Sequence, residues 1–320
     1  MPRQNTVKRP TLVPPVNALT VRSLGLRAER ALDNEATVTL IQTLRGALHP
    51  YLGGLAAEVD GEMTRFRAEK GHGEALRRAS WVVLVAVLCM LTIRFLGNED
   101  DIKRLVSLVR FFGADEAAAQ LDFLLRKHPD RKLHVRIFWC ISRLTCYGLL
   151  PALAIRFALR ERLSDYGVGL GVGRAHLRTY LLLFAIVLPA VVVASFEPAF
   201  QAKYPYYRFA PGEPLWPNLL YWELLYASQF FALELFFRGF LIHGMRKSIG
   251  YLAVLFPIIP YVMIHFGKPL PEAIGSLVTG FVLGTLSLKS RSIVGGALIH
   301  VAVAVSMDVL SLWHRGLLGS

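Results

Sequence analysis

The chain has 320 residues, of which 54% are hydrophobic and only 18% charged, and its mean hydropathy is +0.43. This composition excludes one or two water-soluble domains, because too few polar residues are present to cover their surfaces. The net charge of +13 does not indicate a nucleic-acid partner, because the basic residues lie in short segments between apolar stretches and form no single patch. We therefore predict an all-α, polytopic transmembrane helix bundle that is surrounded by the lipid bilayer.

The first 79 residues are polar and carry several prolines at their start. Apolar residues then recur at three- and four-residue steps, as on one face of a helix; they are Val38, Ile41, Leu44, Leu48, Leu52 and Leu55. We predict a soluble helical N-terminal arm over residues 1–79. Its apolar stripe either packs inside a helical hairpin or rests on a partner or on the membrane surface.

Seven apolar segments follow, and each approaches or reaches the roughly 20 residues that cross a bilayer as a helix. They cover residues 81–97, 137–159, 180–200, 219–242, 251–264, 273–288 and 293–313. We predict about seven spans, and six to eight would fit because Arg94 and Arg143 interrupt the first two. Residues 80–178 would hold the early spans with an extramembrane helical insert, and residues 179–320 would form the core.

Basic residues occupy loops at alternate crossings, namely around residues 156–178, 246–247 and 289–291. Cytoplasmic loops are rich in Lys and Arg, so these three loops are predicted to face the cytoplasm. Abundant Arg and Ala, with no eukaryotic targeting signal, favour a bacterial inner (cytoplasmic) membrane. The three cysteines all fall in apolar segments and are predicted to be core thiols.

Ionisable residues inside the late spans point to the function. A charge at mid-bilayer costs about 2.5 to 3.5 kcal/mol on insertion scales, so such residues usually face the bundle interior and mark function. Glu234 and Arg238 lie four residues apart in the fourth span, which places carboxylate and guanidinium on one helix face. An isolated pair of this kind could also do no more than brace its own helix.

Two histidines add to this pair. The next span is broken by Pro257 and Pro260 and ends in His265, where a cavity is expected. The last span contributes His300, and Glu272 and Asp308 are secondary candidates, at the start of the sixth segment and in the last span respectively.

A buried carboxylate and an imidazole can hold one water molecule and take its proton, and a second imidazole can donate to the oxyanion that forms. That set is sufficient to hydrolyse a peptide bond. Glu234, His265 and His300 would also suit a hydrolytic zinc ion as ligands. The residues therefore leave a metal-free and a zinc-assisted water open, and they indicate no other cofactor.

At these residues the chain resembles the CAAX prenyl protease and bacteriocin-processing family of intramembrane proteases (CPBP, Abi-type). The family's first motif, Glu-Glu-x-x-x-Arg followed by Gly, matches residues 233–239 with Leu233 in the place of the first Glu. Its second motif, Phe-x-x-x-His, matches Tyr261 and His265. In its final motif, His followed four residues later by Asn or Asp, His300 matches and Ala304 does not. The resemblance covers roughly residues 219–312, with the motifs in the correct order.

The resemblance implies a role for each matching residue. Glu234 would be the general base, His265 its water-holding partner, Arg238 the structural counter-ion and His300 the oxyanion donor. Glu223 lies 11 residues before Glu234, about 16 Å away along a helix, and cannot easily replace it.

The predicted function is thus an intramembrane endopeptidase that hydrolyses a peptide bond in a membrane-associated protein or peptide. Two alternatives stay open. Leu233, in the place of the first motif glutamate, favours a catalytically silent membrane scaffold or escort protein. Buried Glu, Arg and His also line transporter and proton paths.

Overall fold

The computed structural model describes residues 35–169, 174–209 and 214–318; the side chains of residues 35–52, 174 and 175 are outside it. Two compact units are distinguished, residues 1–55 and 56–320. Helix α2 (Glu35–Lys70) is continuous through Pro50 and provides the described part of the first unit. Most of the predicted apolar stripe, from Val38 to Leu52, falls outside the described side chains.

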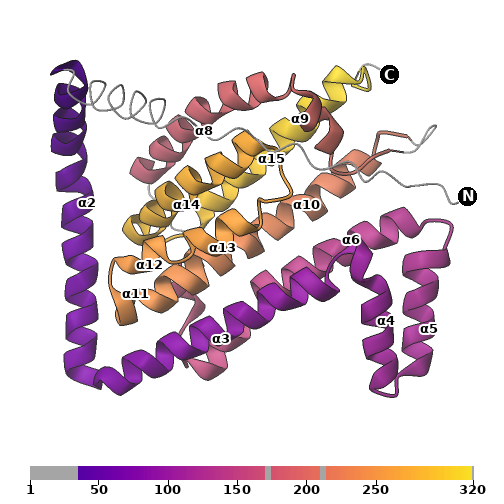
Figure 1. Cartoon of the computed structure of the whole chain (residues 1–320), viewed down its shortest axis with the longest axis horizontal. Coiled ribbons are helices and arrows are strands. Elements are labelled where there is room, and N and C mark those ends of the chain that lie inside the picture. The colour runs from indigo at the N-terminus through magenta and orange to yellow at the C-terminus, as the bar shows by residue number, and fades with distance from the viewer. Residues whose placement is uncertain (1–34, 170–173, 210–213, 319–320) are drawn as a thin grey trace, which may run out of the picture. The chain divides into compact units, whose positions relative to one another are not determined.

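The described part of the second unit contains helices and loops but no strand, and six of its helical stretches are long and apolar enough to cross a membrane (Figure 1). They are α3 (His72–Leu96), the stretch Arg131–Ala158, α8 (Arg174–Ala194), the stretch Asn218–Ile249, α14 (Leu270–Ser290) and α15 (Val294–His314). The stretch Arg131–Ala158 begins with α6 (Arg131–Arg143). The stretch Asn218–Ile249 is formed by α10 (Asn218–Glu234), η6 (Leu235–His243) and α11 (Gly244–Ile249). A shorter apolar stretch, Leu252–Met263, contains α12 (Leu252–Leu255) and α13 (Ile258–Met263). The predicted all-α polytopic bundle is confirmed.

The stretch Asn218–Ile249 is the centre of the bundle. Two thirds of its apolar window, 67%, is buried inside the chain, against 11% for the window of α8. Its aromatic residues Phe236, Phe237 and Phe240 form the core with residues of α3 and of the stretch Arg131–Ala158, such as Val82 and Ile155. A central helix is shielded from lipid on most sides, which is where charged side chains are tolerated best.

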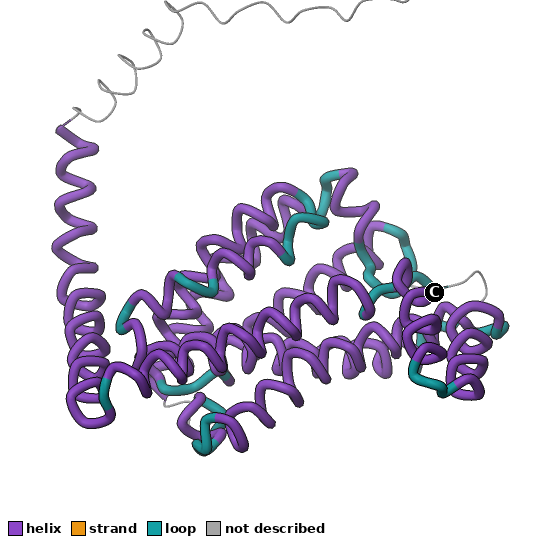
Figure 2. Tube along the Cα trace, turned by 60° about the horizontal axis from the view of Figure 1, so that its bottom comes forward, coloured by secondary structure: helices purple, strands orange, loops and turns teal. Residues whose placement is uncertain are grey.

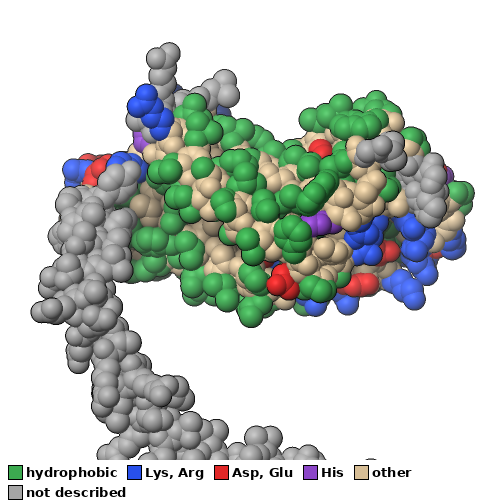
Figure 3. Space-filling model, turned by 90° about the horizontal axis from the view of Figure 1, so that it is seen from above, with side chains coloured by type: hydrophobic (Ala, Val, Ile, Leu, Met, Phe, Trp, Pro, Cys, Tyr) green, Lys and Arg blue, Asp and Glu red, His purple; other side chains and the backbone are tan. Residues whose placement is uncertain are grey.

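Hydrophobic side chains spread over the middle of the face in Figure 3, and charged ones gather toward its ends. This is the distribution expected where acyl chains cover the middle of a bundle. Among the exposed residues of the long helices are Leu88, Leu181, Ile186 and Val193.

At one end of the bundle Glu161 joins three segments. It pairs with Arg78 of α3 at 2.8 Å and with Lys247 of α11 at 2.8 Å, and it accepts a hydrogen bond from the Tyr166 hydroxyl. Burial acts to raise the pKa of Glu161, but Arg78, Lys247 and the Tyr166 hydroxyl outweigh it and hold that pKa at about 2. The carboxylate therefore stays charged and fastens α3 to α11.

Outside the spans, α4 (Ile102–Phe111) and α5 (Asp115–Asp122) form a helical hairpin between α3 and α6. Figure 2 shows it as a pair of short neighbouring helices beside the long ones. Helix α9 (Pro198–Lys203) lies in the connection from α8 to α10.

Candidate active site

The site is built on one turn of the central span. The four-residue spacing of Glu234 and Arg238 places them on one helix face, and Arg238 Nη1 lies 2.9 Å from Glu234 Oε1. Both side chains are fully enclosed, with at most 2% of either exposed. The Arg238 guanidinium also covers the Tyr261 ring, 4.2 Å from its centroid. The predicted pairing of acid and base is present.

Helix α15 adds an imidazole. His300 Nδ1 lies 2.9 Å from Glu234 Oε1, and His300 Nε2 lies 2.8 Å from the hydroxyl of Tyr261. A neutral imidazole has one N–H, so donation from Nδ1 to the carboxylate leaves Nε2 to accept from the tyrosine hydroxyl. Arg238, Glu234, His300 and Tyr261 therefore form one continuous row contributed by three helical segments.

The close approach of α15 to Glu234 depends on a glycine. A Cβ placed on Gly296 would lie 2.5 Å from Glu234 Oε2, which is too close for any other residue without a shift. The neighbouring Gly295 plays the same part for the ring of Tyr180. Both Arg238 and His300 approach Oε1 at 2.9 Å, whereas Oε2 is the oxygen that faces Gly296.

His265 stands beside this row and outside it. Its Nδ1 lies 2.7 Å from the backbone oxygen of Tyr261, and its ring centroid is 4.8 Å from that of Tyr261. Burial lowers the pKa of His265, so the neutral ring is favoured. Because Nδ1 carries the proton that the carbonyl accepts, Nε2 is the free acceptor. No direct contact with Glu234 occurs among the described residues; Tyr261 links the two.

The residues do not fit the zinc site that sequence left open. Among the described residues, no group of three or more His, Cys, Asp or Glu side chains could hold a metal ion. Both ring nitrogens of His300 are engaged, by Glu234 and by Tyr261. The set of Glu234, His265 and His300 therefore does not converge on one point.

The two positions that depart from the family motifs are apolar packing positions. Leu233 is buried in the core cluster with Phe236 and Phe237. Ala304 is buried among Trp222 and Tyr226. Among the described residues, no hydrogen bond or ion pair from a neighbouring polar side chain replaces the carboxylate missing at position 233 or the amide or carboxylate missing at position 304.

The secondary candidates lie away from the row. Glu272 pairs with Lys268 at 3.0 Å and accepts a hydrogen bond from the Tyr204 hydroxyl at 2.9 Å. Asp308 accepts a hydrogen bond from the backbone N–H of Tyr206 at 3.1 Å and faces the carboxyl of Glu223. Glu272 and Asp308 thus hold the connection before α10 against the bundle.

Sequence reasoning missed two features. Tyr261 was expected only as an aromatic residue, yet its hydroxyl completes the row; the difference between Tyr and the Phe of the family motif was the available signal. The contact between Glu223 and Asp308 was also missed. This contact depends on α10 and α15 running antiparallel in one particular register. The spacing of residues along the chain does not determine that register.

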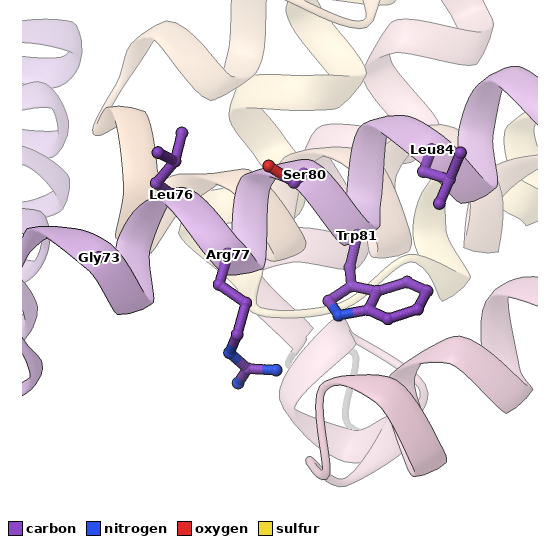
Figure 4. Close-up of a pocket in the computed structure, with 6 residues that line it drawn as sticks. All are labelled: Gly73, Leu76, Arg77, Ser80, Trp81 and Leu84. Carbon is purple, nitrogen blue, oxygen red and sulfur yellow. The ribbon is translucent and has the colours of Figure 1, made fainter.

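The surface has two hollows of very different size among the described residues. A cavity of about 10 Å³, close to the smallest volume that holds one water molecule, lies beside the row; it is lined by Phe237, Arg238, Ile242, Pro257, Ile258, Tyr261 and Gly280. A larger hollow of about 420 Å³ runs along α3 alone (Figure 4), where Arg77 and Trp81 point to the same side. It contains no residue of the row, so only the small cavity bears on chemistry.

A protein-family model described as Type II CAAX prenyl endopeptidase Rce1-like matches residues 214–306, less than a third of the chain. The matched segment contains Glu234, Arg238, His265 and His300, and it confirms the resemblance drawn from those motifs. No curated protein and no solved structure matches the chain. The match supports a CAAX-type intramembrane protease in general and assigns no catalytic residue.

Proposed function

We propose that this chain is an intramembrane endopeptidase that hydrolyses a peptide bond in a membrane-associated protein or peptide. One observation carries the proposal: a buried carboxylate, guanidinium, imidazole and phenol meet in a single row at bilayer depth. Bracing of the central helix would need only Glu234 and Arg238. His300 and Tyr261 come from two other segments, and burial of their polar groups is energetically unfavourable. A role in proton transfer explains why these two side chains join the pair.

In the proposed reaction Glu234 is the general base. Its Oε1 is held by Arg238 and His300, so Oε2 is the atom left to accept a proton from water. The water oxygen bonds to the substrate carbonyl carbon, and the carbonyl oxygen takes the negative charge. Breakdown breaks the C–N bond, and the proton held on Glu234 passes to the leaving amine, so atoms and charge balance.

The oxyanion is assigned to His300 together with Tyr261. The hydroxyl of Tyr261 lies on His300 Nε2, and the Tyr261 ring lies under the Arg238 guanidinium. His300 Nε2 can donate to a substrate oxygen only once it carries a second proton, so in the neutral tautomer the Tyr261 hydroxyl, after rotation toward the substrate, is the donor. His265, with Nε2 as a free acceptor, is placed to hold the water or a substrate N–H.

The test uses the purified full chain in liposomes with a fluorogenic, lipidated peptide that ends in a CAAX sequence. Glu234→Gln and His265→Ala should each abolish cleavage while both variants insert and accumulate like the parent. Unchanged cleavage by either variant would remove the assigned role of that residue. Incorporation of one ¹⁸O atom from labelled water into the new carboxyl group would show that water is the nucleophile.

A second function is favoured by the burial of Leu233 in the apolar core, since the first motif carboxylate is then absent. The chain would be a catalytically silent scaffold or escort of a membrane partner. Under this alternative, Glu234→Gln should keep full cellular activity, and removal of residues 1–79 should abolish it. The two variants together separate the proposals.

The division into an arm (residues 1–79), early spans with an insert (80–178) and a protease core (179–320) is part of the proposal, as is a bacterial inner membrane location. The family match falls wholly inside the third region.

A further inference from the structure

The helical hairpin of α4 and α5 does not take part in the proposed chemistry. It leaves α3 at Glu99 and returns to α6 at Arg131, so both of its ends are tied to membrane-spanning helices. Its inner faces form a separate apolar core; the members are Ile102, Val106, Ala118, Leu125 and Val135. In Figure 1 the two helices run across the direction of α3 and α6 rather than along it.

The tip of this hairpin is strongly apolar on its outside. Phe111 and Phe112, where α4 ends, have 81% and 76% of their surface exposed, and Leu108 has 38%. Turns that face water usually carry Gly, Asn, Asp, Ser or Pro. Two adjacent phenylalanines exposed at one tip instead mark a surface that is covered by something apolar.

One face of α4 is continuous with the lipid-facing surface of α3. Arg104, Leu108 and Phe111 follow one another at steps of four and three residues, so they share a helix face. Arg104 Nη1 donates to the backbone oxygen of Phe95 at 2.9 Å, and its guanidinium covers the Phe95 ring at 5.5 Å. Phe95 belongs to the last turn of the span α3 and is itself 45% exposed. The apolar face of α4 therefore starts where the lipid-facing side of α3 ends.

Most charges of the hairpin and its two connections are paired with one another. Five ion pairs join residues of the hairpin and its two connections; they are Arg104 with Asp101, Arg110 with Asp115, Arg126 with Asp122, Lys127 with Asp122 and Arg131 with Glu99. The pairing leaves little excess charge with which to select an acidic or basic protein. An apolar surface with satisfied charges fits the boundary between headgroups and acyl chains, where basic side chains extend to the headgroups.

We propose that the hairpin of α4 and α5 lies on the bilayer surface at its end of the bundle, with Phe111 and Phe112 inserted between headgroups and acyl chains. The recognised partner is a lipid surface of no particular headgroup charge. This attachment fixes how far α3 and α6 can tilt. It does not depend on the proposed hydrolysis.

The test places one fluorescent label at a time on the full-length chain in liposomes of phosphatidylcholine. Phe111→Cys and Phe112→Cys carry the label at the tip. The matched control is Gln120→Cys on α5, two residues and thus about 200° from the packed Ala118. The three native cysteines are buried, with at most 2% exposed, so labelling is selective.

Nitroxide-bearing phosphatidylcholine should quench the tip labels, and aqueous iodide should quench the control label. Tip emission should shift to the blue relative to the control, with or without added phosphatidylglycerol. Three results would overturn the proposal: tip labels as open to iodide as the control, tip labels shielded from both quenchers as under a protein, or lipid quenching that requires the anionic lipid. Equal monomeric behaviour of the labelled variants in detergent establishes that they fold.

Discussion

Helices α10 and α15 meet at two acidic positions with different surroundings. At one, Glu234 touches Arg238 and His300, so its charge is balanced and connected to Tyr261. At the other, Glu223 faces Asp308, a second carboxylate. Two carboxylates that face each other repel and do not balance one another's charge. The comparison teaches that the partners of a buried glutamate, and not its presence in a span, identify a site for proton transfer.

Removal of the cation should make the first position resemble the second. In Arg238→Met, Glu234 becomes a buried carboxylate without a counter-charge, which costs about 3 to 5 kcal/mol of stability. We expect a large loss of accumulated protein and a lower unfolding temperature in detergent. The double variant Arg238→Met with Glu234→Gln should recover much of the loss. A single variant as stable as the parent would show that the pair is not important for folding.

Gly296 sharpens the comparison, because it allows α15 to approach Glu234. In Gly296→Ala the new Cβ meets Glu234 Oε2 at 2.5 Å, so the carboxylate must move away from its partners. Misplacement of a reacting group by about 1 Å can lower a rate by about 100-fold. Turnover should fall by about that factor, while Gly275→Ala, where a Cβ meets nothing within 4 Å, should leave it unchanged. Equal turnover of the two variants would contradict the assigned role.

A variant of Tyr261 tests whether the hydroxyl on His300 Nε2 contributes to turnover. Tyr261→Phe removes the hydroxyl on His300 Nε2 and keeps the ring under Arg238. Groups that orient a functional histidine typically contribute about 10- to 100-fold, and we expect a loss of that size in kcat with little change in KM. The control is Tyr147→Phe, in the apolar cluster with Phe236 and Phe237. A rise in KM with kcat unchanged would instead assign Tyr261 to substrate binding.

Glu161 resembles Glu234 in its partners but lies outside the spans, and the smallest effect is expected there. Its pKa is about 2 in the folded chain, against an ordinary value of 4.5. A lowered pKa of an acid gives stability that is complete above about pH 4.5 and is lost as the pH falls through 2, at most about 3 kcal/mol in all. The contribution of Glu161 to the unfolding temperature in detergent should therefore be constant from pH 5 to 8. Glu161→Gln should remove the loss between pH 4.5 and 2, and an unchanged loss would assign it to other carboxyls.

What could be predicted from the sequence followed from local geometry. The spans follow from length and apolarity, and the pairing of Glu234 with Arg238 follows from a spacing of four on one helix. The closeness of His300 to Glu234 could be predicted only from the family resemblance and from the chemical need for an imidazole beside the carboxylate. The position of His265 could not be predicted, because Pro257 and Pro260 break the segment before it and its direction depends on how α13 packs on α14.

The most direct measurement is turnover of the lipidated CAAX peptide by Glu234→Gln and Glu223→Gln side by side in the same liposomes. Both variants neutralise a glutamate of α10; Glu234 is fully buried and faces Arg238 and His300, whereas Glu223 is half-buried and faces Asp308. The account predicts a loss of about 10²- to 10⁴-fold for Glu234→Gln, the usual contribution of a general base, and turnover close to that of the parent for Glu223→Gln. Equal turnover of the two variants, whether high or low, would contradict it.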